Sequence, residues 1–249
     1  YLKRNETLKP EWVSIVPNGI DPARLVTTDR AQARQALSLP EDSFLFVSLA
    51  SYDLRKNHLG TLTAFNQIAK QYPKAHLLCA GNRLDPYYYK KTAAYRDSLS
   101  QKDQIHLMDF REDTGTLLSA SDCFVINSFF EGWSLAATEA LIVGLPLIHS
   151  ECGSAWELVG SNKERGLVVP NPACTPLNMT YQHVLEVGSM EQQWNTEALV
   201  QAMSRMIEDE QHWRWRRESI SSESRQMFSL NSSMEKYARL FRELLGIHA

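Results

Sequence analysis

The sequence predicts an α/β fold in which helices cover both faces of a Rossmann-like parallel sheet. Between residues 40 and 170, short apolar runs alternate with segments of helical periodicity. Such an alternation forms β-α-β units, and their right-handed crossovers place helices on both faces of a parallel sheet. Ligands bind to such sheets beyond the carboxyl ends of the strands, so we expect function in the loops that follow the strands.

Six segments are expected to be the strands: residues 44–50, 76–81, 105–108, 123–128, 145–149 and 166–169. Helices are expected between them at residues 31–39, 58–72, 88–99, 114–119 and 135–143 and around Trp156. The segment 58–72 shows the helical pattern clearly, because these apolar side chains share one face: Leu59, Leu62, Phe65, Ile68 and Tyr72.

Three further parts flank this core in what we expect to be one domain, residues 1–249. Residues 1–25 are expected to form a linker and a leading strand, in which an apolar run from Ser14 precedes a turn with proline and glycine. Residues 171–193 are polar, contain two early prolines and are expected to be an insertion loop, whereas residues 194–249 predict helices at 196–209, 212–227 and 232–245. Because the chain begins with Tyr1 rather than Met, we expect it to be a piece of a longer protein.

The composition narrows the classes of partner. A formal net charge of -3 gives no broad electropositive field for nucleic acid or an anionic membrane, so any anion site must be local. No signal peptide and no apolar run of roughly 18 residues is visible, so we expect a cytoplasmic protein without a transmembrane segment.

Neither cysteines nor histidines predict a metal site. The cysteines are widely spaced and are expected to be free thiols: Cys79, Cys123, Cys152 and Cys174. The histidines form no H-E-x-x-H or Cys/His group, so no metal is expected. No loop completes a G-x-G-x-x-G motif, which disfavours a dinucleotide cofactor.

The segment 129–144 is the most informative part of the chain. It leaves a strand, turns through Glu131 and Gly132, and enters a helix near Ser134. The free backbone N–H groups of Ser134, Leu135 and Ala136 would then point out of a helix N-terminus, which favours phosphate through hydrogen bonds and the helix dipole. We therefore predict an anion pocket here.

Two glutamates flank this pocket. Glu139 lies one turn into an otherwise apolar helix, where a buried carboxylate without partners would cost several kcal/mol, so we expect donors such as ligand hydroxyls. Glu131 lies in the preceding loop and could accept hydrogen bonds from a sugar. The pair suits a ligand with hydroxyls at both ends and phosphates in the middle. The alternative is that Glu139 is an exposed helix residue and Glu131 a turn residue.

A second candidate loop follows the first strand. Arg55 and Lys56 directly precede a helix there, and a cation at this edge could neutralise a diphosphate. The alternative is that these two basic residues are simply solvated. The segment 81–83, which follows the second strand, and Gly153 offer further close backbone approach.

These residues resemble a known family. Glu131 and Glu139, separated by seven residues within EGWSLAATE, are similar to the E-x7-E signature of the retaining glycosyltransferases of family 4, which have the two-domain GT-B fold. The resemblance covers nearly the whole chain, through VPNGID (16–21), RKNH (55–58), LLSASDCFVINSFFEGW (117–133), GLPLIHSECGSAWELV (144–159) and ERGLVVPNP (164–172).

The resemblance implies roles for individual residues. Lys56 would contact the donor diphosphate, Glu139 the ribose hydroxyls and Glu131 the transferred sugar. Amides near Ser134 and Leu135 would bind phosphate, and the backbone around Arg111 would meet the base.

The chain also departs from the family pattern in three places. The family usually has an arginine about five residues before Lys56, where this chain has Ser51, so Arg55 would substitute or phosphate binding would be weaker. The common Gly-Gly pair is reduced to Gly153 and Ser154, and 171–193 resembles an insertion.

The resemblance implies the donor-binding C-terminal domain of such an enzyme, which transfers a hexose from a UDP- or GDP-linked donor to a glycan or lipid-linked saccharide with retention of configuration. It implies no cofactor or metal, and an N-terminal acceptor-binding domain as partner, without which transfer would be poor. Peripheral membrane association would come through the full enzyme. The alternatives are a nucleotide-sugar epimerase or phosphorylase of the same fold, and a non-catalytic nucleotide-sugar-binding module.

Overall fold

The predicted parallel sheet forms with all six expected strands. The computed structural model describes residue 9 and residues 12–246. Within them the strands are β1 (Phe44–Leu49), β2 (Ala75–Ala80), β3 (Ile105–Met108), β4 (Cys123–Ile126), β5 (Leu147–Ser150) and β6 (Gly166–Val169). Every neighbouring pair is parallel, and the order is β3-β2-β1-β4-β5-β6. The predicted fold class is confirmed.

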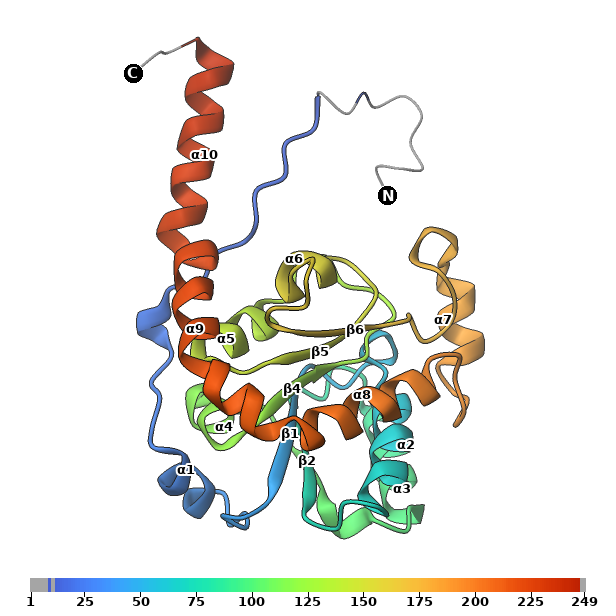
Figure 1. Ribbon diagram of the computed structural model, residues 1–249. Coiled ribbons are helices and arrows are strands. Elements are labelled where there is room, and N and C mark those ends of the chain that lie inside the picture. The colour runs from blue at the N-terminus through green and yellow to red at the C-terminus, as the bar shows by residue number, and fades with distance from the viewer. Residues whose placement is uncertain (1–8, 10–11, 247–249) are drawn as a thin grey trace.

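The expected helices lie between the strands and follow them (Figure 1). They are α1 (Arg30–Ala36), α2 (His58–Ala69), α3 (Pro86–Ser98), α4 (Thr114–Ala120), α5 (Leu135–Val143), α6 (Ala155–Val159), α7 (Tyr181–Val187), α8 (Thr196–Glu208), α9 (Glu210–Phe228) and α10 (Leu230–Leu245). Contacts place α2 and α8 together on one face of the sheet and α4, α5 and α9 on the other. Strands covered on both faces explain the nearly continuous apolar runs in the sequence.

Three local expectations differ from the structure. No strand forms near Ser14; the segment instead runs past the α9–α10 junction, where Ile20 makes an isolated bridge with Ser229. β5 begins at Leu147 rather than at residue 145, because Pro146 has no backbone N–H for the ladder. The expected loop at 171–193 contains α7, whose first turn Thr180 caps.

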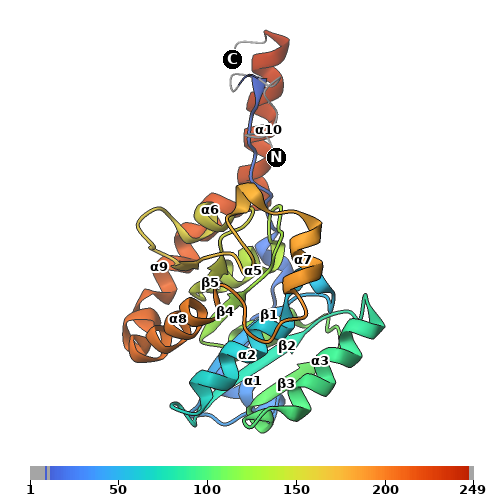
Figure 2. The same ribbon diagram turned by 90° about the vertical axis from the view of Figure 1, so that its right-hand side faces the viewer.

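Helix α10 stands away from the rest of the molecule in both views (Figures 1 and 2). Among the described residues, its hydrogen bonds to the segment before α1 lie at its start, where Ser233 Oγ donates to the carbonyl of Pro17 at 2.7 Å and the amide of Leu230 donates to that of Ile20 at 2.8 Å. Residues 17–20 therefore lie beside the junction of α9 and α10.

A buried ion pair holds the amino-terminal end of the sheet together. The guanidinium of Arg34, 1% exposed, contacts Asp122 Oδ2 at 2.6 Å. The same carboxylate accepts from the amide of Leu45 at 2.8 Å and pairs with Arg30 at 3.1 Å. Carbonyls around Arg34 accept its remaining N–H groups, so the buried charge is fully partnered. This cluster joins α1 to the starts of β1 and β4.

Replacing Asp122 by Ala is expected to lower the free energy of unfolding by about 3–5 kcal/mol, because Arg34 would remain buried without its counter-charge. The urea unfolding midpoint measures the effect. Asp42→Ala removes an exposed partner of Lys74 and should leave the midpoint nearly unchanged. Equal midpoints for the two variants would contradict a structural role for the buried pair.

Candidate functional site

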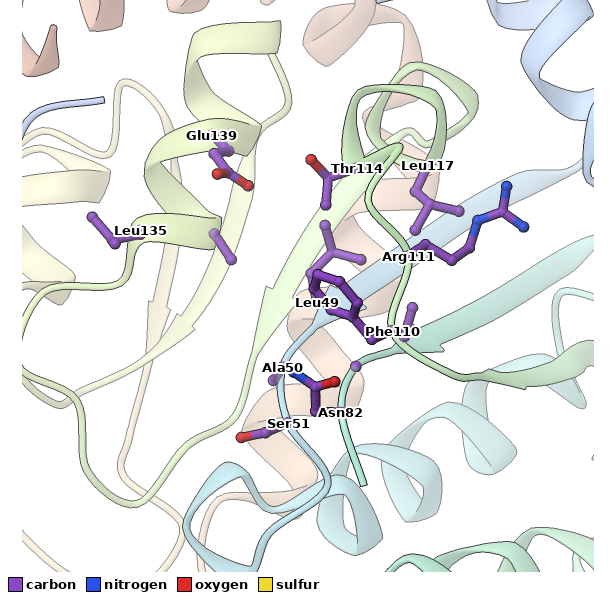
Figure 3. Close-up of a pocket in the computed structure, with 13 residues that line it drawn as sticks. Leu49, Ala50, Ser51, Asn82, Phe110, Arg111, Thr114, Leu117, Leu135 and Glu139 are labelled. Atoms are coloured by element: carbon purple, nitrogen blue, oxygen red, sulfur yellow. The ribbon is translucent and has the colours of Figure 1, made fainter. Parts of the chain in front are cut away.

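A cavity of about 320 Å³ opens at the carboxyl ends of the strands (Figure 3). It lies where the chain order reverses between β1 and β4, the point at which the loops of such a sheet diverge and ligands bind. The ends of β1 and β2, the loop after β3, and the starts of α4 and α5 line it: Leu49, Ala50, Ser51, Ala80, Gly81, Asn82, Phe110, Arg111, Thr114, Leu117, Leu135, Ala136 and Glu139. Its size is that of a small-molecule pocket.

The N-terminus of α5 forms one wall of this cavity. Ser134 is the N-cap, and its Oγ accepts from the amide of Ala137 at 3.3 Å. Among the hydrogen bonds of the described residues, none uses the amides of Leu135 or Ala136, and both residues line the cavity. Two backbone donors and the positive end of the helix dipole therefore face the space, as an anion site requires.

Glu139 also faces this cavity. In Figure 3 its carboxylate points into the space, toward the side on which Thr114 lies. Burial raises the pKa of Glu139, and the charge of Arg24 lowers it by a smaller amount. In the described part of the chain no side-chain hydrogen bond satisfies this carboxylate, so its acceptors remain available to a ligand.

Lys56 and Glu131 meet at a neighbouring position. Lys56 ends the 3-10 turn η4 (Leu54–Lys56) after β1, and its Nζ lies 2.7 Å from Glu131 Oε1. The hydroxyl of Ser128 donates to the same oxygen at 2.7 Å. The two loops are also joined directly, because the amide of Phe129 donates to the carbonyl of Arg55 at 2.9 Å. The structure thus brings two predicted site residues into one ion pair.

Glu131 lies beside a second cavity, of about 440 Å³, on the far side of the β4–α5 loop. It is lined by Phe129, Phe130, Glu131, Cys152, Gly153, Pro176, Leu177 and Met179. Gly153 has φ +51, and a Cβ there would lie 2.5 Å from the carbonyl oxygen of Glu131, so the backbones touch and a side chain is excluded. Glu139 therefore lines the first cavity and Glu131 the second, so the structure does not bring the two predicted acids into the single pocket that the sequence led us to expect.

Two predicted arginines make local ion pairs. Arg55 contacts Asp53 at 3.1 Å with its side chain 53% exposed, and this hydrogen bond raises the pKa of Arg55. Arg111 contacts Asp113 at 2.6 Å, and Figure 3 shows its guanidinium on the side away from Glu139. Neither guanidinium enters the first cavity; at Arg111 the backbone is the part available to a ligand.

Sequence reasoning missed several residues of the site. Ser128 and Phe110 each lie two residues after the end of a strand, a position that could have marked them, and Phe110 is 56% exposed at the first cavity. The buried amides of Asn57 and Gln193 bond to each other although they are 136 residues apart. No local pattern signals such a contact.

Two expectations bear on the chemistry of the site. The cysteines are free, as predicted, and three of the four are buried. Within the described ranges no cluster of three or more His, Cys, Asp or Glu side chains could hold a metal ion.

No helix in the described ranges is both long and apolar enough to cross a bilayer.

The comparison with known proteins decides the family. The sequence profile described as "Glycosyl transferases group 1" matches residues 29–201, well over half of the chain. The chain belongs to this glycosyltransferase family. The resemblance noted from Glu131 and Glu139 is thereby confirmed.

Individual relatives of this glycosyltransferase domain agree. The UDP-Gal:alpha-D-GlcNAc-diphosphoundecaprenol alpha-1,3-galactosyltransferase of Escherichia coli is 29% identical over 147 residues, which are 57% of this chain and 37% of that protein. The chain spans between 34% and 52% of the length of the curated relatives it matches.

Solved structures show the same fold. HepE of Anabaena, crystallised in complex with UDP-glucose, superposes with a TM-score of 0.75 at 19% identity over 95% of this chain and 59% of that one. The C-terminal domain of the group 1 protein LpcC from Francisella tularensis superposes with a TM-score of 0.62 at 17% identity, covering 88% of this chain and 98% of that one. The described fold is therefore that of a C-terminal GT-B domain.

Replacing Glu139 by Gln is expected to raise the thermal unfolding temperature by a few degrees at pH 7, since about 1 kcal/mol corresponds to roughly 2–4 °C in a chain of this size. An acid whose pKa is raised by folding opposes folding once it ionises, so the wild type loses stability as the pH rises above about 4.3. Below that pH the carboxyl is protonated in both states.

The difference in unfolding temperature between the wild type and the Glu139→Gln variant should therefore disappear at low pH. Melting curves between pH 3.5 and pH 7 test this expectation. Glu157→Gln, on the exposed side of α6, controls for the loss of a charge. A Glu139→Gln variant that melts with the wild type at every pH would contradict the burial argument.

Proposed function

We propose that this chain is the donor-binding half of a retaining glycosyltransferase, which transfers a hexose from a nucleotide-diphosphate sugar to a glycan or lipid-linked saccharide. The observation that carries the proposal is the pair of unengaged amides at the start of α5, with Glu139 on one side and the Lys56–Glu131 pair on the other. Family membership and the naming of nucleotide-sugar donors among relatives support it.

Each part of the donor would meet a group of matching chemistry. The base would lie against the backbone around Arg111, beside the exposed ring of Phe110. The ribose hydroxyls would donate to Glu139, which compensates the desolvation of that carboxylate. The diphosphate would accept from the amides of Leu135 and Ala136. The hexose would lie at Glu131.

The Lys56–Glu131 ion pair would supply the two charged side chains that act on the phosphates and on the sugar. Without a donor, the ammonium and the carboxylate neutralise each other at 2.7 Å. A diphosphate on α5 would compete for the ammonium, leaving Glu131 free to accept from the sugar while Ser128 still holds it. As the bond to the sugar breaks, charge grows on the departing diphosphate, and Lys56 and the helix amides would stabilise it.

A non-catalytic binding module is the second candidate, and one observation favours it. Ser51 stands where the family usually has an arginine, and its hydroxyl bonds to Asp53 at 2.8 Å. Arg55, the residue expected to substitute, bonds to the same Asp53. Lys56 would then be the main cation of this loop for the phosphates. Product analysis with an acceptor and a protein that contains both GT-B halves separates transfer from binding alone.

Replacing Lys56 by Ala is expected to weaken binding of UDP or GDP by about 10- to 100-fold, because a hydrogen bond to a charged group contributes roughly 1.5–3 kcal/mol. Calorimetric titration with both nucleotides and their sugars measures the effect. Lys74→Ala removes an exposed lysine just before β2, at the amino-terminal end of the sheet, and should leave the affinity unchanged. A wild-type chain that binds none of these nucleotides and nucleotide sugars would contradict the proposal.

We also propose that α10 packs against the acceptor-binding domain of the same enzyme. Its apolar side chains recur at helical spacing along one exposed face: Leu230, Met234, Tyr237, Phe241 and Leu244. The helix stands clear of the α/β body, so that body leaves the stripe uncovered (Figure 2). An apolar stripe of this length is typical of a protein–protein contact.

In a two-domain protein with this chain as its C-terminal half, Phe241→Asp is expected to lower transfer at saturating donor by about tenfold or more, because a charge would enter the interface. Donor affinity of the chain itself should not change. Rates of transfer and calorimetry measure the two quantities. Arg242→Asp, one position along the helix, is the control for an added charge, and an equal loss in both variants would contradict the contact.

A further inference from the structure

The amide side chains of Asn57 and Gln193 form a reciprocal pair in the interior. Asn57 Nδ2 donates to Gln193 Oε1 at 2.8 Å, and Gln193 Nε2 donates to Asn57 Oδ1 at 2.8 Å. Asn57 is 0% exposed and Gln193 is 6% exposed. A Cβ on Gly60 would collide with Gln193 Oε1, so the glycine leaves room for the pair. The contact joins the end of the 171–193 segment to the loop after β1.

Asn57 is the residue directly after Lys56, and its backbone has little freedom. It ends η4 and caps α2 in a left-handed conformation with φ 55. Its side chain also donates to the carbonyl of Asn127 at 3.0 Å, and Asn127 Oδ1 accepts from Asn195 at 2.8 Å. One buried amide network therefore connects the loop of Lys56 to the end of β4, which leads into the loop of Glu131.

The 171–193 segment is fastened to the same two loops elsewhere. At its start, Asn171 Nδ2 donates to the carbonyl of Phe129 at 2.9 Å. In its middle, α7 packs on η4 through a small apolar cluster in which Leu54 contacts Phe129, Met179 and Val184. The segment thus contacts both the Lys56 loop and the Glu131 loop.

We propose that Gln193 is a positioning residue for the donor diphosphate, which acts through Asn57 on Lys56. The proposal rests on the proposed function. Gln193 lies away from both cavities, so it touches no ligand; it fixes the turn from which the ammonium extends. The 171–193 segment, which the family resemblance marked as an insertion, thereby sets how firmly phosphate is held.

The geometry also shows why a variant should still fold. Without the Gln193 amide, Asn57 Nδ2 keeps the carbonyl of Asn127, and Asn57 Oδ1 keeps the amide of Gly60 at 3.4 Å. Gln193→Met preserves the length of the side chain and removes both bonds to Asn57, together with the bond that Gln193 Nε2 donates to the carbonyl of Val187 at 3.3 Å. Gln201→Met makes the same change at an exposed position of the neighbouring helix, where the amide bonds only to Glu197.

Titration of the wild-type chain and its variants with UDP and UMP, or with GDP and GMP, tests the proposal. Gln193→Met is expected to weaken binding of the diphosphate by roughly five- to tenfold and binding of the monophosphate by less than about twofold, because Lys56 would bind the diphosphate. In a Lys56→Ala background the same substitution should weaken binding of the diphosphate by less than about twofold. Gln201→Met should change neither.

Three outcomes would overturn the inference. Unchanged diphosphate affinity in Gln193→Met shows that the pair does not position Lys56. Equal losses for diphosphate and monophosphate show a general structural role, as does a full further loss in the Lys56→Ala background. In each of these three outcomes the wild type binds the nucleotides, so the proposed function stands. A wild type that binds neither the uridine nor the guanosine nucleotides overturns both the proposed function and this inference.

Discussion

The reversal of strand order between β1 and β4 is the constraint on which the rest of this site depends. Helices leave these two neighbouring strands toward opposite faces, so the loops after them separate and leave a space that no side chain of the core fills. The same divergence sets Lys56 in one loop against Glu131 in the other, and it turns the start of α5 toward the opening. Polar groups that would otherwise be costly to bury are collected at this edge.

The charged side chains at the two ends of the sheet differ in whether they have partners within the protein. At the amino-terminal end, Asp122 and Arg34 pair with each other, neighbouring backbone groups meet their other hydrogen bonds, and the pair serves the fold. At the carboxyl end, Glu139 is half-buried without a hydrogen-bond donor in the described chain, and burial raises its pKa. A carboxyl whose pKa is raised by folding lowers stability once it ionises, which fits the ligand-binding role proposed for Glu139.

The segment 171–193 and helix α10 extend the site in opposite directions. The first packs inward and fastens the two loops that hold Lys56 and Glu131, with Asn171 and Gln193 as its anchors. The second points outward and carries its apolar stripe away from the body. Under the proposed function, the first would steady the loops that hold the donor and the second would contact the acceptor-binding domain.

The sequence by itself determined the layers of the fold, because buried parallel strands and amphipathic helices leave periodic apolar patterns that need no tertiary information. It also determined the start of α5 and the candidates Glu131, Glu139 and Lys56, since a loop between a strand and a helix can be placed locally. It misjudged residues 14–25 and 171–193, where a few apolar residues fit more than one conformation.

Only the tertiary structure decided which of these residues meet. The Lys56–Glu131 pair joins loops 75 residues apart in the chain, and the Asn57–Gln193 pair spans 136 residues. Such contacts depend on how elements pack, and periodicity and spacing report only the neighbours within one element.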